Sequence, residues 1–86
     1  MFGDFDIDIT GDGSRSVVHV YGDIDAKTSP QVRAVILNLF KERGQKRVIV
    51  DLKGAMRIDN SGASSLMAGF EVAQKRNAEF VLTGLN

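Results

Sequence analysis

One serine is the residue best placed to carry reversible chemistry. It lies in the segment Ile58-Asp59-Asn60-Ser61-Gly62, which follows an apolar run and precedes a stretch whose apolar residues recur at helical spacing. Asn60 or Ser61 is expected to cap a helix that begins here, because both residue types are common at helix N-termini. The N–H groups and dipole of such a helix end favour negative charge, so a phosphate on Ser61 could be held there without melting the helix. It would add roughly −1.5 to −2 charges and repel an apolar or acidic partner surface, so we expect Ser61 to be a phosphorylation site that controls binding.

Asp23 and Asp25 form a second candidate site. A D-x-D pair at the end of a strand could hold Mg²⁺ for phosphoryl transfer, because this ion prefers oxygen ligands. No further carboxylate cluster lies nearby in the sequence. This favours a polar loop in which Asp25 helps to cap the following helix, and we expect no metal and no cofactor.

Asp51 is an alternative phosphate acceptor. It ends the apolar run Val48–Val50, as the phosphorylated aspartate ends a buried strand in response-regulator receivers. Receivers also need an acidic pair at the end of the first strand and a lysine at the end of the fifth. The first strand expected here offers only alternating aspartates, and no fifth strand is expected, so the receiver interpretation ranks below the Ser61 hypothesis.

Intrinsic catalysis is not expected. A nucleophilic serine needs a base within hydrogen-bond reach. His19 is the only histidine, and it lies within an expected strand that nothing in the sequence places beside Ser61. A chain of 86 residues also leaves little room for a deep substrate cleft. The sequence therefore predicts a binding protein and not an enzyme.

The composition narrows the remaining classes of partner and location. Eleven basic residues balance eleven acidic ones, so neither nucleic acid nor an anionic lipid surface is a default partner. The absence of cysteine excludes disulfides and thiolate metal sites. No apolar run is long enough to span a membrane, and residues 1–4 lack the features of a signal peptide, so we expect a cytoplasmic protein.

The elements that must position these groups follow from periodicity and turn residues. Residues 4–9 alternate acidic and apolar side chains, which predicts a strand that a turn at 11–14 joins to a second strand at 17–21. A helix is expected to follow, with Ser29 as its N-cap, Pro30 at its first position and Gly44 beyond its end.

The second half of the chain repeats the strand-helix order. Val48–Val50 is apolar without alternation, which predicts a strand buried on both faces, and residues 80–82 predict the last strand. Between them a helix should begin near Ser61, with its buried face formed by Ala63, Leu66, Met67, Phe70 and Ala73. The predicted fold is α/β, with a small, mixed, largely parallel four-stranded sheet and two principal helices.

Several of these segments, in this order and spacing, resemble STAS domains, the bacterial anti-sigma factor antagonists and their relatives. They are Gly22-Asp23-Ile24-Asp25, Thr28-Ser29-Pro30, Val48-Ile49-Val50-Asp51-Leu52, Ile58-Asp59-Asn60-Ser61-Gly62 and Phe80-Val81-Leu82-Thr83-Gly84-Leu85. The resemblance implies one STAS-like domain over residues 1–86.

The resemblance also implies a function. In that family the phosphorylated residue directly precedes the glycine, which corresponds to Ser61. The unmodified protein would bind an anti-sigma factor with serine kinase activity and so free a sigma factor, which makes it a regulator of transcription. The kinase would end the capture by phosphorylating Ser61, and a separate phosphatase would reverse it. The residues expected to contact the partner are Asp23, Asp25, Asp59, Asn60, Ser61, Gly62, Ser64 and Ser65, the last two being expected on the helix surface.

The chain departs from the family pattern in three places. Asn60 stands where antagonists often have serine or threonine, and Ala63 where a larger apolar residue is common. The C-terminal helix of the family has no counterpart in this sequence, so uncovered apolar surface and some self-association are expected. The alternative function keeps the fold but binds permanently to a lipid-transporting ABC system or a stress-signalling assembly, with Ser61 silent.

Overall fold

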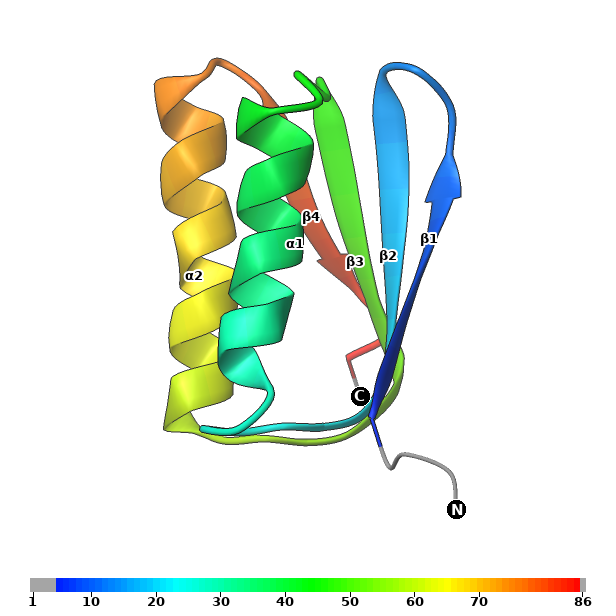
Figure 1. Cartoon of the computed structure of the whole chain (residues 1–86), viewed down its shortest axis with the longest axis vertical. Coiled ribbons are helices and arrows are strands. Elements are labelled where there is room, and N and C mark those ends of the chain that lie inside the picture. The colour runs from blue at the N-terminus through cyan, green and yellow to red at the C-terminus, as the bar shows by residue number, and fades with distance from the viewer. Residues whose placement is uncertain (1–4, 86) are drawn as a thin grey trace.

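The chain folds into one four-stranded sheet with two helices, as a computed structural model shows (Figure 1). The structure describes residues 5–85, so Asp4 of the predicted first strand lies outside the described residues. The elements in chain order are β1 (Asp6–Gly11), β2 (Arg15–Ile24), α1 (Ser29–Lys41), β3 (Arg47–Ile58), α2 (Asn60–Lys75) and β4 (Glu79–Thr83). The strands lie in the order β1-β2-β3-β4, with β1 antiparallel to β2 and the other neighbours parallel. The predicted fold class is therefore confirmed.

Both helices cover the same face of the sheet (Figure 1). Alternate strand residues point into this layer, so Val18, Val20, Val48 and Val50 are fully buried beneath α1 and α2. The opposite face carries no helix among the described residues, and we call it the open face. It is formed by the intervening residues, among them His19, Ile49 and Asp51. The prediction that the Val48–Val50 strand is buried on both faces is wrong, because Ile49 is only half-buried on the open face.

Helix α1 begins with a different cap from the one predicted. Its N-cap is Thr28, and Ser29 is already a buried helical residue. The Thr28 hydroxyl makes no capping bond because it donates to the carbonyl of Asp23 at 2.7 Å and accepts the N–H of Asp25 at 2.9 Å. The loop before α1 is therefore closed on itself by its own side chains.

Strand β3 is longer than the sequence suggested. It continues for seven residues past Asp51, which therefore lies inside the strand and not at its C-terminal end. Its pairing with β4 stops at Asp51 and Thr83, and its register with β2 shifts twice. The bulged second half of β3 still carries the chain to the start of α2 at the same end of the sheet as the end of β2.

Helix α2 also buries a different face from the one predicted. Leu66 and Ala73 are buried as expected, but Ala63, Met67 and Phe70 are exposed. The helix instead packs through small residues: a Cβ on Gly69 would overlap the Phe80 ring. Small residues allow close approach but contribute little to an apolar pattern, which is why periodicity selected the wrong side. Within residues 5–85, neither helix combines the length and apolar character needed to cross a bilayer.

Candidate functional site: the Ser61 end

Two connections lie side by side at one end of the sheet (Figure 1). One runs from β2 into α1 through Asp25, and the other runs from β3 into α2 through Asp59. Their strands are parallel neighbours, with Ile24 opposite Ile58, and the Asp59 N–H donates to the Ile24 carbonyl at 3.2 Å. We call these two connections and the first turn of α2 the Ser61 end.

A glycine holds the helix start against the neighbouring strand. A Cβ on Gly62 would overlap the carbonyl oxygen of Ile24 and crowd its side chain, so no larger residue fits without displacement. The close contact fixes the first turn of α2 beside the end of β2, which carries Asp23, and the loop that carries Asp25. It therefore brings together residues that lie more than thirty positions apart in the sequence.

Asp59, and neither Asn60 nor Ser61, caps helix α2. Its Oδ1 accepts the Gly62 N–H at 3.0 Å, and its carbonyl accepts the Ala63 N–H at 2.9 Å. The prediction of the capping residue is therefore wrong by one or two positions. Since Asp59 is the cap, Ser61 is the second helical residue, and its hydroxyl is not needed for capping.

The Ser61 hydroxyl is partly accessible. The residue is half-buried, and its side chain makes no hydrogen bond within residues 5–85. The backbone N–H groups of Asn60 and Ser61 likewise find no acceptor in that range, since they precede the first intrahelical bonds. A phosphate on Ser61 would thus lie beside unused donors at the positive end of the helix dipole.

Asp23, near the end of β2, and Asp25, in the loop that follows, have different roles. Asp25 Oδ1 accepts the N–H groups of Lys27 at 2.9 Å and Thr28 at 3.2 Å. The bond from Lys27 is the main cause of a pKa lowered below the ordinary aspartate value. Asp25 therefore shapes the loop before α1, while Asp23 contributes its carbonyl to Thr28 and leaves its carboxylate half-buried. In the described part of the chain no three His, Asp or Glu side chains form a metal-binding group.

The two serines of the next turn are not equivalent. Ser64 is exposed, as expected for a residue that could contact a partner. Ser65 is only 5% exposed, and its hydroxyl donates to the Ser29 carbonyl at 2.8 Å between the two helices. The prediction that Ser65 lies on the surface and contacts a partner is therefore corrected, because its hydroxyl is already used inside the protein.

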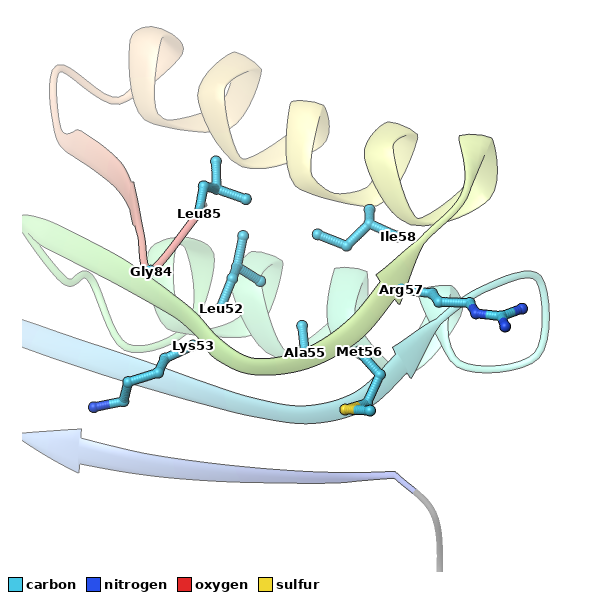
Figure 2. A pocket seen from close by; sticks show the side chains of 8 residues that line it. All are labelled: Leu52, Lys53, Ala55, Met56, Arg57, Ile58, Gly84 and Leu85. Atoms are coloured by element: carbon cyan, nitrogen blue, oxygen red, sulfur yellow. The ribbon is translucent and has the colours of Figure 1, made fainter.

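Apolar side chains line a hollow next to the Ser61 end; the sequence predicted uncovered apolar surface but did not locate it. Beyond the end of β4, a hollow of about 280 Å³ lies along the second half of β3. Figure 2 shows Leu52, Ile58 and Leu85 turned toward the α2 side of this hollow, while Lys53 and Arg57 point away from them. Met67 and Phe70, on α2, are exposed as well.

A row of polar side chains crosses the open face. Asp51 Oδ2 lies 3.0 Å from His19 Nδ1, and His19 Nε2 lies 3.1 Å from the Thr10 hydroxyl. The pKa of Asp51 is lowered chiefly by the Lys53 N–H and secondarily by His19. This row joins β1 to β3 through β2, which gives the single histidine a structural role. The receiver interpretation required Asp51 to lie at the end of a strand. Asp51 instead lies inside β3 and pairs with His19, so this interpretation is not supported.

Comparison with known proteins agrees with this architecture. A family model described as "Mlab, STAS domain" matches residues 7–86. The anti-sigma factor antagonist SpoIIAA, solved in its unphosphorylated form, is 16% identical over 95% of this chain and 74% of its own, with a TM-score of 0.80. SpoIIAA in its phosphorylated form, described as a Bacillus cell fate determinant, gives a TM-score of 0.78 at 16% identity, over 95% of this chain and 73% of its own. An anti-sigma factor antagonist from Mycobacterium paratuberculosis is 23% identical over 93% of this chain and 68% of its own, with a TM-score of 0.77. At these identities the structural likeness establishes the fold.

Proposed function

Because the chain belongs to the STAS domain family, we propose that it is a phosphorylation-regulated binding protein of the anti-sigma factor antagonist kind. In its unmodified form it captures an anti-sigma factor with serine kinase activity. Phosphorylation of Ser61 by that kinase ends the capture, and a phosphatase restores it. The proposal places the protein in the bacterial cytoplasm and assigns it no catalytic role of its own.

The observation that carries this proposal is the position of the Ser61 hydroxyl. It is partly accessible in the first turn of α2, while Asp59 performs the capping. Phosphorylation can therefore change the surface charge without removing a bond that holds the helix. SpoIIAA has been solved both phosphorylated and unphosphorylated, which supports phosphorylation as a modification of this fold.

The partner would contact the Ser61 end and the apolar surface beside it. We assign to this contact Asp23, Asp25, Asp59, Asn60, Ser61 and Ser64. Gly62 was also expected to contact the partner, but it is buried against Ile24, so it positions the helix start and is not part of the contact. Two phosphate charges added at the centre of this group would oppose a partner surface that is apolar or acidic. Unmodified Ser61 leaves the surface free to pack.

The test uses two serines of the same helix turn. The chain is incubated with ATP and the serine kinases of its native cell, and phosphate is located by mass spectrometry. We expect modification of the parent and of Ser64→Ala, and none of Ser61→Ala. Kinase binding should persist in Ser61→Ala and weaken at least about tenfold in Ser61→Asp, since the added charge opposes docking. Phosphate on another residue, or equal binding by both Ser61 variants, would contradict the switch.

A permanent association is the second candidate function. The exposed apolar side chains of α2, Met67 and Phe70, would suit a constant subunit of a lipid-transporting ABC system or a stress-signalling scaffold. In that case the partner would copurify with the parent, Ser61→Ala and Ser61→Asp alike. Loss of the partner only from Ser61→Asp would favour the switch over the permanent complex.

A further inference from the structure

Basic residues gather at the end of the molecule opposite Ser61. Seven of the eleven Lys and Arg residues lie in or beside the turns where the helices end and β2, β3 and β4 begin (Figure 1). These seven residues, which we call the basic end, are Arg15, Lys41, Arg43, Lys46, Arg47, Lys75 and Arg76. Among the described acidic residues, only Asp12, Glu42 and Glu79 lie in the same turns or at the same strand ends. A chain without net charge therefore has a strongly positive end.

Lys46 is the centre of this group. Its N–H donates to the Ser14 carbonyl at 2.7 Å, and its carbonyl accepts the Glu79 N–H at 2.9 Å, so it lies between the start of β2 and the start of β4. A hollow of about 340 Å³ is lined by Lys46, Lys75 and Arg76. A second hollow, of about 220 Å³, is lined by Lys46 together with Arg15, Arg47 and one acidic residue, Glu79. Two adjacent cationic depressions are thus joined at one lysine.

Among the described residues, Glu79 lines the second hollow and pairs with Arg47, and the other four cations of the two hollows have no ion-pair partner. Glu79 lies 3.5 Å from Arg47, and Asp12 accepts the N–H groups of Ser14 and Arg15. Within residues 5–85 the only other ion pair is that of His19 with Asp51, on the open face. Lysines in the last turns of α1 and α2 complement the helix dipoles, but this does not account for the cations at the starts of β2 and β3.

We propose that the basic end binds the phosphate groups of an anionic phospholipid membrane, at its surface and without insertion. Each Lys or Arg close to an anionic membrane surface contributes roughly 1 kcal/mol of attraction, so seven such residues at one end of the molecule favour that surface. No residue lining the two hollows is aromatic or has a large apolar side chain, so the site offers neither stacking for nucleobases nor a wedge for the bilayer interior.

This orientation leaves the Ser61 end free. The molecule measures 36 × 24 × 24 Å, and the basic end and the Ser61 end lie at opposite ends of the long axis (Figure 1). A protein held by its basic end would direct Ser61 away from the lipid surface. Membrane attachment would therefore place the protein without blocking the partner surface, and the two proposals can succeed or fail separately.

The experiment measures cosedimentation of the full chain with vesicles at low salt. One set contains only phosphatidylcholine, and the other contains equal parts phosphatidylcholine and phosphatidylglycerol. The triple variant Lys46→Gln, Lys75→Gln, Arg76→Gln removes charge from the basic end. Its matched control, Lys27→Gln, Lys53→Gln, Arg57→Gln, removes two lysines and one arginine from elsewhere on the surface.

We expect the parent and the control to bind the anionic vesicles and to be released by added salt. The basic-end variant should bind at least about tenfold more weakly, since each cation near an anionic surface contributes separately. Unchanged far-ultraviolet circular dichroism would verify that both variants are folded, and all six substituted residues are exposed.

Three results with vesicles would overturn the proposal. They are absence of parent binding to anionic vesicles at low salt, equal weakening by the two triple variants, and binding that added salt does not reverse. A single-stranded oligonucleotide bound more tightly than the anionic vesicles would also overturn it, because the partner would then be a nucleic acid.

Discussion

At the Ser61 end, three neighbouring residues have three separate roles: one caps the helix, one allows close packing and one can accept a phosphate. Asp59 supplies the helix cap, Gly62 allows the close approach to β2, and Ser61 keeps a hydroxyl that the fold does not use. An N-cap side chain typically stabilises a helix by about 1 kcal/mol. If Ser61 were itself the cap, modification would cost that stabilisation, whereas here it changes only the surface.

Gly62→Ala should destabilise the protein by about 1–3 kcal/mol, because the added methyl group overlaps the Ile24 carbonyl and forces the backbone apart. Urea denaturation monitored by circular dichroism measures this loss. Gly13→Ala is the control, since a Cβ there meets nothing within 4 Å. A loss of stability no greater than that of Gly13→Ala would show that the helix start can move away from β2.

The pH dependence of stability should report on Asp51. Its pKa is lowered in the folded protein, first by the Lys53 N–H and then by His19. The stabilisation is therefore present above the unfolded-chain pKa, near about 4, and is lost as the pH falls through the lower folded-state pKa. Asp51→Asn should flatten the acid side of the curve of unfolding free energy against pH.

Urea denaturation at a series of acid pH values provides this measurement. His19→Gln is the informative comparison, because it removes the weaker cause of the shift and keeps the Lys53 N–H. It should flatten the curve less than Asp51→Asn does. Flattening by His19→Gln as complete as that by Asp51→Asn would mean that the histidine, and not the backbone, dominates the pKa of Asp51.

At the scale of elements, helix α2 packs against the sheet with one side and exposes apolar side chains on another. Its small residues, such as Gly69, lie against the sheet, and its larger Met67 lies exposed. Phe70 is partly exposed and contacts Phe80 edge-on, with ring centroids 4.8 Å apart. The helix can therefore expose apolar side chains while its packing onto the sheet stays close.

The contact between α1 and α2 depends in part on one buried hydroxyl. Ser65→Ala should cost about 1 kcal/mol, because it removes the hydrogen bond to the Ser29 carbonyl in a buried site. Ser64→Ala, one position earlier and exposed, should stay within about 0.5 kcal/mol of the parent. Thermal unfolding of the two variants compares them directly, and equal midpoints would show that the buried hydroxyl contributes nothing.

At the scale of the whole molecule, the exposed apolar surface should cause some self-association. Leu85 is 62% exposed beside the hollow along β3. Leu85→Gln should lower the apparent mass at high concentration, as measured by light scattering. Ile9→Gln, which changes a side chain 46% exposed on the other edge strand, should not. A parent protein that remains monomeric at every concentration would contradict the expectation.

The two ends of the molecule also differ in charge, and this difference comes from the topology. All helices of a parallel βαβ arrangement end on the side where the next strand begins, so the Lys and Arg of those turns collect together. Asp23, Asp25 and Asp59 collect at the other end for the same reason. The whole chain can therefore have different partners at its two ends.

The sequence alone determined the elements and their order. The alternation in residues 4–9, the helical spacing around Leu66 and the turn residues act locally, over distances shorter than one element. They were enough to predict a mixed four-stranded sheet, two helices and a serine at the start of the second helix. Local patterns predicted the elements because each helix or strand buries one face. One-sided burial produces a periodic pattern of apolar residues along the sequence.

The tertiary structure decided what depends on contacts between distant residues. Asp59 became the cap because β3 extends to Ile58, and Ser65 became buried because α1 lies against it. His19 lies beside Asp51 only because β2 pairs with β3. The buried face of α2 depends on the close packing of Gly69 against the Phe80 ring. The balanced composition concealed the basic end, because net charge sums over the chain whereas binding depends on which turns meet in space.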